Sequence, residues 1–385
     1  MEYFLSEQQK AIKSLARKIA EEKILPVRAQ LDEKEEFPWE IMKDLAYTDM
    51  FRIFIPEKYE GLGGGCLDLC LVVEELSRVC SAVAISYAAT ALGVTPLLES
   101  GSDEQKRKYL PDIAAGRKLA AFGLTEPTAG SDAGAIQTTA KKTAGGYLLN
   151  GTKQFITNGG EAEIYTVIAL TDKARGARGA SAFVLEKGMP GFTFGRKEKK
   201  MGIRASATRE LVFEDCFVPE ENLLGKEGMG FLVTLKTFDK VRPGIAAQAV
   251  GIAQGAMEAA VDYARQRVQF GHPIIALQAI QHMLADMAIQ VEAARALTYA
   301  AARTVDSGAK QISEEAAMCK VFASDVAMKV TTDAVQVFGG VGYMRDYPIE
   351  KMMRDAKITQ IYEGTNQVLR NTVALELRKR KAKTE

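Results

Sequence analysis

The sequence is poor in the residues that build metal centres, disulfide frameworks and hydrolytic sites. It has only two histidines, His272 and His282, and five cysteines, none of which form a CxxC pair. Cys66 and Cys70 could face one another on a helix, but neither histidine is near them in sequence, so buried thiols are favoured. Disulfide frameworks belong to short secreted chains, and the GxSxG motif of serine hydrolases is missing. We therefore expect no structural metal, a reducing compartment and no serine hydrolase.

Neither sign of charge is in excess. Fifty Lys and Arg residues are balanced by 49 Asp and Glu residues, and the formal net charge is +1. This balance lacks the broad positive field that nucleic-acid binding usually requires, so we expect no nucleic-acid partner. With 47% hydrophobic and 26% charged residues, the composition is typical of a soluble globular protein. A length of 385 residues predicts two or three packed domains.

Signals for export and for membrane insertion are also weak. The first residues, MEYFLSEQQK, lack the basic start and apolar run of a signal peptide and the Arg- and Ser-rich pattern of a transit peptide, which predicts a cytoplasmic protein. Residues 79–98 carry no charge, and this run is close to the length of a membrane span. Its Ser, Thr, Gly and Pro content is unfavourable for a span, so we expect a helix buried inside the protein and no membrane insertion.

The first third of the chain has the spacing of helices. Residues 1–120 contain several apolar patterns of helical period. Two of these helices have capped starts in the sequence: Ser6 is followed by Gln9, and Ser102 is followed by Glu104. This part is predicted to be an all-α domain.

The periodicity then changes twice. Residues 121–225 hold five short β-branched and aromatic runs that predict strands: GGYLLNGTKQFITN, EIYTVIALT, SAFVLE, GFTFGRK and RELVFEDCFV. Gly, Asn and Pro separate these runs and no convincing helix lies between them, which favours an antiparallel barrel or sandwich. Residues 226–385 return to helical spacing and predict a four-helix bundle. One bundle helix carries an a/d seam formed by Leu277, Ile280, Leu284, Met287, Val291 and Ala294. The fold class is therefore α+β, with three domains at these boundaries.

Four short segments combine residue types that occur in ligand sites, and each also has an ordinary structural explanation. YEGLGGG at 59–65 and FGGVGY at 338–343 are glycine-rich without GxGxxG spacing, so a flexible connection and a helix end explain them. FGLTEPTAGSD at 122–132 is an interdomain turn, or a turn whose amides and hydroxyls face a polar ligand. Glu363, in ITQIYEGTNQ, is a solvated charge or a base.

Taken together, six segments in this order resemble the acyl-CoA dehydrogenase family. They are FGLTEPTAGSDAG, GTKQFITNGG, FDKVRPGIAAQAVGIAQGA, RVQFGHPI, QVFGGVGY and YPIEKMMRDAKITQIYEGT, and they extend over nearly the whole chain. The resemblance implies a flavoenzyme that removes two hydrogens from Cα and Cβ of an acyl-CoA thioester and produces the trans-2-enoyl-CoA. It implies FAD as cofactor, an electron-transferring flavoprotein as acceptor and a homotetramer built as a dimer of dimers.

The resemblance also implies roles for residues of this chain. Glu363 matches the catalytic base, which needs a desolvated pocket to raise its pKa, and its backbone N–H matches a donor to the thioester oxygen. The matched flavin contacts are Phe122, Leu124, Thr125, Ser131, Phe155, Thr157, Thr365 and Gln367. The flavin contacts matched to a neighbouring subunit are Arg267, Phe270, Gln278, Gln336 and Gly340. The matched substrate or CoA contacts are Ser131, Asp239, Arg242, Tyr362 and Gly364.

Two positions limit which subfamilies the chain can resemble. Isovaleryl-specific relatives carry the base at the position of Val241, and glutaryl-specific relatives carry an arginine near the position of Val83. The chain is therefore most similar to the short-chain (butyryl-CoA) and medium-chain types, and a short straight acyl group is expected. Phe155 stands where the family often has tryptophan, so an aromatic side chain is retained there without the indole.

Three alternatives remain. Within the same fold, the substrate is a cyclic or otherwise unusual acyl-CoA, or the enzyme is an oxidase that passes electrons to oxygen. Small residues of the charge-free helix would leave width for an alicyclic acyl group: Ala88, Ala89, Ala91 and Gly93. From a different class, the chain is a flavin-free scaffold, although the presence of Glu363, Thr157 and Arg267 argues against this.

Overall fold

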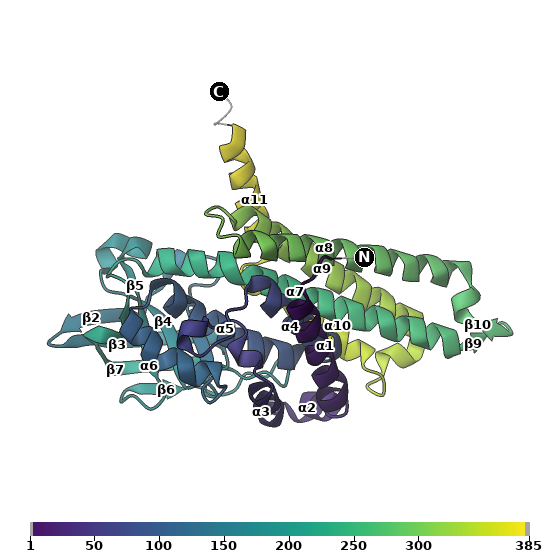
Figure 1. Cartoon of the computed structure of the whole chain (residues 1–385), viewed down its shortest axis with the longest axis horizontal. Coiled ribbons are helices and arrows are strands. Elements are labelled where there is room, and N and C mark those ends of the chain that lie inside the picture. The colour runs from purple at the N-terminus through teal and green to yellow at the C-terminus, as the bar shows by residue number, and fades with distance from the viewer. Residues whose placement is uncertain (1–2, 382–385) are drawn as a thin grey trace.

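The computed structural model describes residues 3–381 as an elongated molecule (Figure 1). The elements follow one another along the chain as helices, then strands, then long helices. The β-sheet lies at one end of the molecule, and the long helices extend from it to a small hairpin at the other end. The predicted α+β architecture, with helical N- and C-terminal parts and a central sheet, is confirmed.

The N-terminal part is helical, as its spacing predicts. Its helices are α1 (Glu7–Ile19), α2 (Arg28–Lys34), α3 (Trp39–Tyr47), α4 (Cys66–Val79), α5 (Ser81–Ser100) and α6 (Asp103–Ala114), with a π-helical turn at Ala20–Ile24. Ser6 and Gln9 form the expected capping box at the start of α1. At α6 the expected capped start at Ser102 is confirmed, but the capping box is completed by Gln105 and not by Glu104, because the third helical residue is the one that faces the cap.

α5 is the charge-free segment, and it is a core helix. It is the one helix among the described residues that is long and apolar enough for a membrane span, but 78% of its most apolar stretch is buried in the protein. It packs against α4, α7 and β1 (Ala120–Gly123). A Cβ atom added at Gly93 would lie 2.6 Å from the backbone nitrogen of Ala121. Gly93 therefore allows α5 to approach β1 closely and does not widen a pocket, contrary to the expectation.

The middle part forms one eight-stranded sheet within the described residues, in the order β6-β7-β3-β2-β4-β5-β8, with β1 paired to β4. The five expected strands are present as β3 (Gly146–Thr157), β4 (Ile164–Leu170), β5 (Ala180–Glu186), β6 (Phe192–Phe194) and β7 (Thr208–Pro219). Three strands were not expected, namely β1, β2 (Thr139–Thr143) and β8 (Leu223–Leu224). Most pairs are antiparallel, but β1 and β2 each run parallel to β4. β1 has only four residues, all buried, and so shows no alternation that would reveal a strand.

The C-terminal part is a bundle of long helices. They are α7 (Gly230–Gln266), α8 (Gln278–Asp306), α9 (Ser313–Phe338), α10 (Ile349–Thr359) and α11 (Asn366–Lys381), with a hairpin of β9 (Val268–Gln269) and β10 (His272–Pro273) between α7 and α8. The predicted seam of α8 packs into the core: its last four residues are buried and its first two are partly buried. α11 projects from the side of the molecule (Figure 1).

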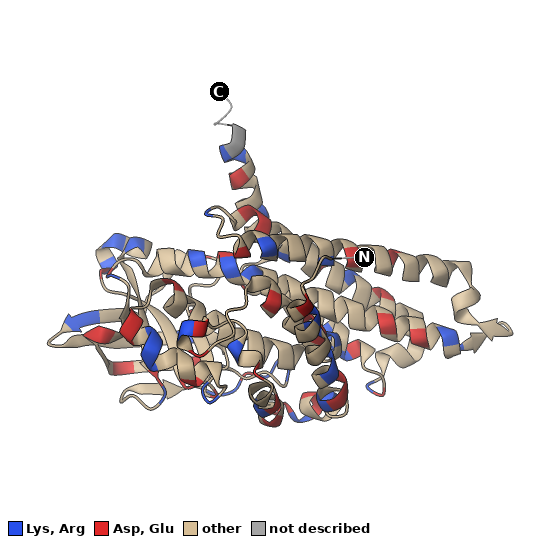
Figure 2. Ribbon diagram, in the orientation of Figure 1, with Lys and Arg blue, Asp and Glu red and all other residues tan. Residues whose placement is uncertain are grey.

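Charged residues of both signs are interspersed along the helices and strands (Figure 2). This distribution agrees with the near-zero net charge of the sequence. Local charge around individual sites therefore decides the electrostatics more than any overall field.

Candidate active site

Glu363 lies in the short loop between α10 and α11, and its backbone has an unusual conformation. The φ angle is 52° at Glu363 and 97° at Gly364. This left-handed region is unfavourable for a residue other than glycine, so surrounding contacts must hold the loop. The backbone N–H of Tyr362 bonds to the carbonyl of Ile358 in α10. The N–H of Glu363 makes no hydrogen bond within the described residues and is available to a ligand.

The Glu363 carboxyl group is desolvated and has no direct partner on one of its oxygens. Its Oε2 atom is shielded from solvent and lacks a hydrogen-bond partner among the described residues. Burial raises the pKa of Glu363 to about 7, against the opposing effect of the positive charges of Arg242 and Lys320. A carboxyl group with this pKa is partly ionised near neutral pH and can accept a proton. A buried acceptor without a protein partner is typical of a functional group that acts on a ligand.

Arg242 connects α7 to this loop. Its Nη1 atom donates to Asp239 Oδ1 at 2.9 Å, and its Nε atom donates to the backbone carbonyl of Glu363. The guanidinium group lies over the ring of Phe238, 5.6 Å from its centroid. Burial raises the pKa of Asp239, which also accepts a hydrogen bond from the hydroxyl of Ser313. Two residues predicted as substrate contacts, Asp239 and Arg242, are therefore beside the predicted base.

Tyr362 anchors the loop to α5 through a chain of hydrogen bonds. Its hydroxyl donates to Gln248 Oε1 on α7, and Gln248 Nε2 donates to the hydroxyl of Ser81 at 2.7 Å. Gln248 and Ser81 are buried. These hydrogen bonds hold Tyr362, the residue directly before Glu363, in a fixed position against α7 and α5.

The turn at residues 122–132 faces α7 from the sheet side. Phe122 makes an edge contact with Phe238 of α7, with ring centroids 5.8 Å apart. Lys153 of β3 holds the turn from within, because its Nζ atom donates to Glu126 Oε1 at 2.6 Å and to the carbonyl of Leu124 at 3.1 Å. Burial lowers the pKa of Lys153 to about 8, against the effect of the Glu126 charge.

Three hydroxyl groups near this turn are available to a ligand. Thr125, Ser131 and Thr157, called here the sheet hydroxyls, are partly or fully exposed, and their hydroxyl groups have no hydrogen-bond partner among the described residues. Phe155 lies in the irregular part of β3, has a φ of 59° and is 58% exposed. Unpaired hydroxyls beside an exposed aromatic side chain suit a flat heteroaromatic group with polar edges. The residues present therefore fit the flavin that the resemblance implies.

Five predicted flavin contacts lie at the other end of the molecule. Arg267 and Phe270 belong to the hairpin segment, and Gln278 begins α8. Gln336 lies in the last turn of α9, and Gly340 lies in the 3-10 turn Gly339–Tyr343 that follows. Phe270 is 88% exposed. The hairpin lies at the end of the molecule opposite to the sheet (Figure 1). A single copy of the chain does not bring these residues to the sheet hydroxyls, so they can meet only in an assembly of copies.

The remaining predicted contacts are at the start of α11. Thr365 Oγ1 accepts a hydrogen bond from the backbone N–H of Val368 at 3.3 Å, so this hydroxyl already caps the helix. Gln367 is exposed. The positions of Thr365 and Gln367 are compatible with a ligand bound at the loop, and their contacts with a flavin remain predictions.

Sequence reasoning missed three buried polar residues that support the site: Lys153, Gln248 and Lys320. Each occupies a buried position in a strand or helix that is otherwise apolar on that side. These residues could have been recognised in the sequence, because each is a lysine or glutamine at a position where the apolar pattern predicts a buried side chain. Such residues are rarely buried without hydrogen-bond partners.

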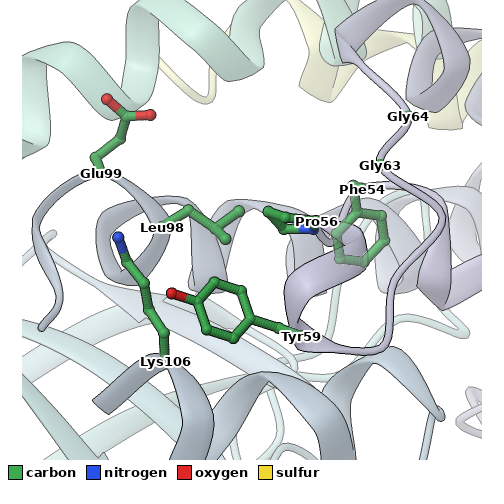
Figure 3. Close-up of a pocket in the computed structure, with 8 residues that line it drawn as sticks. All are labelled: Phe54, Pro56, Tyr59, Gly63, Gly64, Leu98, Glu99 and Lys106. Carbon is green, nitrogen blue, oxygen red and sulfur yellow. The ribbon is translucent and has the colours of Figure 1, made fainter. Parts of the chain in front are cut away.

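A separate hollow of about 320 Å³ lies near the end of α5 (Figure 3). It is lined by Phe54, Pro56, Tyr59, Gly63, Gly64, Leu98, Glu99 and Lys106. Glu99 points toward α7, where it pairs with Lys240 (Figure 3). None of the predicted site residues lines this hollow, so it is a different place from the candidate active site.

Comparison with protein families matches nearly the whole chain. The N-terminal domain of acyl-CoA dehydrogenases matches residues 6–117, the middle domain matches residues 121–216 and the C-terminal domain matches residues 228–377. Among individual relatives, a short-chain-specific acyl-CoA dehydrogenase of Megasphaera elsdenii is 50% identical over 373 residues, which cover 96% of this chain and 97% of the relative. An acryloyl-CoA reductase (NADH) of Anaerotignum propionicum is 47% identical over 382 residues, covering 99% and 97%.

Solved structures agree with these relatives. Butyryl-CoA dehydrogenase from Megasphaera elsdenii superposes with a TM-score of 0.95 and 48% identity, covering 98% of this chain and 100% of that one. A chain from a structural study of the electron transferring flavoprotein of Acidaminococcus fermentans superposes with a TM-score of 0.96 and 52% identity, covering 98% and 99%. The three domain matches and these near-complete similarities show that the chain belongs to the acyl-CoA dehydrogenase family and is an oxidoreductase acting on acyl-CoA.

Proposed function

We propose that this enzyme catalyses the α,β-dehydrogenation of a short, straight acyl-CoA to the trans-2-enoyl-CoA, with Glu363 as the base. The observation that carries the proposal is the Glu363 carboxyl group, which is desolvated, has an unpaired buried Oε2 atom and has a pKa raised to about 7. A thioester Cα proton is weakly acidic, so its removal needs a base of raised pKa at a position free of competing partners. The short-chain type is supported by the buried Val241 and Val83, which leave no base or arginine at those positions.

The chain's own groups can support proton removal in two ways. Oε2 of Glu363 accepts the Cα proton, and the unpaired backbone N–H of the same residue donates to the thioester oxygen, on which negative charge develops. The hydrogen bonds of Arg242 and Tyr362 keep the loop in the conformation that presents both groups. Because these donors are fixed before substrate binds, little reorganisation is needed during the reaction.

FAD is the cofactor of this family, and when bound it supplies the acceptor for the hydride that leaves Cβ. In this proposal the sheet hydroxyls and Phe155 hold the ring system in one copy of the chain. Arg267 and the other residues of the hairpin end hold the pyrophosphate and adenosine end from a second copy, since a guanidinium pairs well with phosphate. This arrangement supports a homo-oligomer, and we propose a homotetramer.

Further parts of the proposal concern the partner, the domains and the compartment. An electron-transferring flavoprotein is the proposed electron acceptor, supported by the similarity to a chain studied together with such a flavoprotein. A division at about residues 120 and 225 agrees with the change from helices to strands and back. All five cysteines are free, which suits the proposed cytoplasmic location.

Anaerobic flavin reduction tests the function. The purified, FAD-loaded enzyme is mixed with butyryl-CoA, hexanoyl-CoA, isovaleryl-CoA, glutaryl-CoA and cyclohexanecarbonyl-CoA, and flavin absorbance is followed. We expect the two short straight substrates to bleach the flavin fastest. Glu363→Gln is the control, because it keeps the size of the side chain and removes its basicity; flavin should stay bound while bleaching nearly stops. The proposal is contradicted if no acyl-CoA bleaches the flavin, or if the variant is bleached at the normal rate. A preference for the cyclic substrate supports the alternative of an unusual acyl-CoA.

A second candidate is the same chemistry in the opposite direction. It is favoured by the 47% identity to an acryloyl-CoA reductase over almost the complete chain. In that direction protonated Glu363 would deliver its proton to Cα of an enoyl-CoA, and the reduced cofactor would supply the hydride for Cβ. Rapid reoxidation of the reduced enzyme by acryloyl-CoA, together with reduction by NADH in the presence of the flavoprotein partner, would favour this direction. Slow reoxidation compared with forward bleaching would exclude it.

A further inference from the structure

A lysine side chain is fully buried behind the loop that carries Glu363. Lys320 lies on α9 and has an exposed fraction of 0%. Its Nζ atom donates to the backbone carbonyl of Gly364 at 2.8 Å and to Asn366 Oδ1 at 3.0 Å. The carboxylates of Glu363 and Asp325 act on it by charge and without a direct hydrogen bond. Burying an ammonium group without a contacting carboxylate is costly, so this lysine is expected to have a specific role.

The two hydrogen-bond acceptors of Lys320, the carbonyl of Gly364 and the side chain of Asn366, lie on either side of Thr365, where the loop enters α11. Gly364 has a φ of 97°, and Asn366 is the first residue of α11. The side-chain amide of Asn366 also donates to Ser324 Oγ and to Asp325 Oδ1, each at 2.8 Å and each on α9. Lys320 is therefore the centre of a buried network that attaches the end of the loop to α9.

The loop is held by two cations from opposite helices. Arg242 on α7 donates to the carbonyl of Glu363 at 3.3 Å, and Lys320 on α9 donates to the carbonyl of Gly364 at 2.8 Å. These are consecutive residues, both with positive φ. A conformation of this kind persists only when surrounding contacts stabilise it. The two hydrogen bonds supply such contacts at the two peptide groups that follow the base.

The charge of Lys320 also acts on the carboxyl group of Glu363. Together with Arg242, it opposes the effect of burial on the pKa of Glu363. The titratable and charged groups around the loop are Asp239 and Arg242 on α7, Cys319, Lys320 and Asp325 on α9, Asp355 on α10, Arg370 on α11, and Tyr362 in the loop itself. Asp239 is paired with Arg242, and Asp325 is paired with Arg370, so their charges are partly compensated. Within the part of the chain that the structure describes, Lys320 has no such direct pair.

We propose that Lys320 is a positioning residue of this active site: it fixes the backbone that presents Glu363 and, by its charge, sets the pH range in which Glu363 acts as a base. The proposal rests on the proposed function of Glu363. A purely structural lysine would stabilise the packing of α9 against α11 and would leave the titration of Glu363 unchanged. The two roles therefore differ in a measurable way.

The test replaces Lys320 by methionine, which keeps the length of the side chain and removes its charge. The matched control is Lys329→Met, on the same helix, where the exposed lysine pairs with Asp333 at 2.6 Å. The ionisation of Glu363 is measured in the FAD-loaded enzyme by infrared difference spectroscopy, with Glu363→Gln in the same background as the reference. Lys320→Met should move the midpoint of the Glu363 titration upward by about one pH unit or more, because an opposing positive charge has been removed. Lys329→Met should leave it unchanged.

The pH profile of anaerobic flavin reduction is the second measurement. The acid limb, along which Glu363 loses its proton, should move upward with Lys320→Met by the same amount as the infrared midpoint. At pH 7 the rate should fall by about fivefold for a shift of one pH unit and should recover partly at higher pH, while KM changes less than kcat. Lys320→Arg should restore the position of the acid limb because it keeps the charge.

A third measurement separates the backbone contact from the charge. Asn366→Ala removes one acceptor of Lys320 and keeps the ammonium group. Amide hydrogen exchange over residues 360–368 should become faster in both Asn366→Ala and Lys320→Met, whereas the Glu363 midpoint should move only in the latter. If Lys320→Met does not fold, Lys320→Gln, which also lacks the charge, takes its place in the titration, and Asn366→Ala tests the positioning role.

The outcomes distinguish this inference from the proposed function. An unchanged Glu363 midpoint in folded Lys320→Met overturns the role of the charge, and unchanged hydrogen exchange overturns the positioning role. If the parent enzyme is not reduced by any acyl-CoA, the proposed function fails, but the infrared titration and the hydrogen exchange still decide whether Lys320 controls Glu363.

Discussion

Arg242 Nε lies 3.3 Å from the backbone carbonyl oxygen of Glu363 and donates a hydrogen bond to it. The same guanidinium group lowers the pKa of the Glu363 side chain, which burial alone would raise further. One residue of α7 thus acts on the base both through the backbone and through charge. Both effects favour catalysis: the hydrogen bond holds the loop in place, and the positive charge favours the ionised form of the carboxyl group.

Arg242→Met should slow anaerobic flavin reduction at pH 7 by about tenfold or more, because a smaller fraction of Glu363 is ionised and the loop loses a contact. The variant also leaves Asp239 with Ser313 as its remaining hydrogen-bond partner. Arg265→Met is the control, since Arg265 is on the same helix and is exposed in a pair with Asp262. Equal rates in both variants, measured with equal flavin content, would show that Arg242 does not support the base.

The raised pKa of Glu363 predicts a pH-dependent cost to stability. The fold favours the protonated carboxyl, because its pKa rises from 4.5 to about 7 on burial. The stability associated with this preference is present below pH 4.5 and is lost as the pH rises through 7. Replacing Glu363 by Gln, which cannot ionise, should therefore stabilise the protein above pH 7, by up to about 3 kcal/mol.

Thermal unfolding at several pH values checks this prediction. The melting temperature of Glu363→Gln should exceed that of the parent at pH 8, and the difference should disappear near pH 4.5. Glu7→Gln, at an exposed position paired with Lys10, is the control and should show no comparable gain. A gain that is the same at both pH values would indicate a packing effect of the glutamine rather than removal of a buried charge.

The sequence predicted the parts of the site that are local in the chain. The segment around Glu363, the turn at residues 122–132 and the strand with Thr157 are continuous stretches, and their residue types are informative by themselves. Five of the eight strands of the main sheet were also visible as apolar runs. β1 was missed because four buried residues do not show alternation.

The supporting contacts could not be predicted, because their partners are distant in sequence. Lys320 and Gly364 are 44 positions apart, and Tyr362 and Gln248 are 114 positions apart. The local periodicity shows only that a polar residue such as Lys320 or Gln248 occupies a position expected to be buried. It does not predict which distant residue the side chain contacts. Gly93 shows the same limit, since a small residue in a helix is compatible with an open pocket and with close packing, and only the position of β1 decides between them.

Tyr362→Phe should weaken the protein without stopping the reaction. The change removes the hydroxyl that donates to Gln248, and it leaves a buried acceptor unpaired at a cost of about 1–2 kcal/mol. The ring remains, and the hydrogen bonds of Arg242 and Lys320 to the loop are unchanged. Flavin reduction should therefore keep its rate within about threefold, since loss of one loop contact is tolerated while both cations remain.

A double-mutant cycle checks the origin of this effect. Gln248→Leu removes the acceptor and also leaves the Ser81 hydroxyl without its donor. If the hydrogen bond is responsible, the double variant should be less destabilised than the sum of the two single variants. Additive losses would mean that the two side chains contribute independently.

Close packing of α5 on β1 predicts that Gly93 tolerates no side chain. A Cβ atom at Gly93 would lie 2.6 Å from the backbone nitrogen of Ala121 and 2.9 Å from atoms of Ala120, so the helix and the strand must move apart. Gly93→Ala should lower the free energy of unfolding by about 1–3 kcal/mol. Gly130→Ala is the control, because an added Cβ atom there would meet nothing within 4 Å.

The same substitution also tests how the sheet side of the site is held. β1 leads directly into the turn that contains Thr125, so displacement of β1 should weaken FAD retention in Gly93→Ala. Fluorescence of released flavin during dialysis, together with thermal unfolding of the apoprotein, separates the two effects. Normal stability and normal flavin retention in Gly93→Ala would contradict the close approach of α5 and β1, and would restore the interpretation of Gly93 as part of an open pocket.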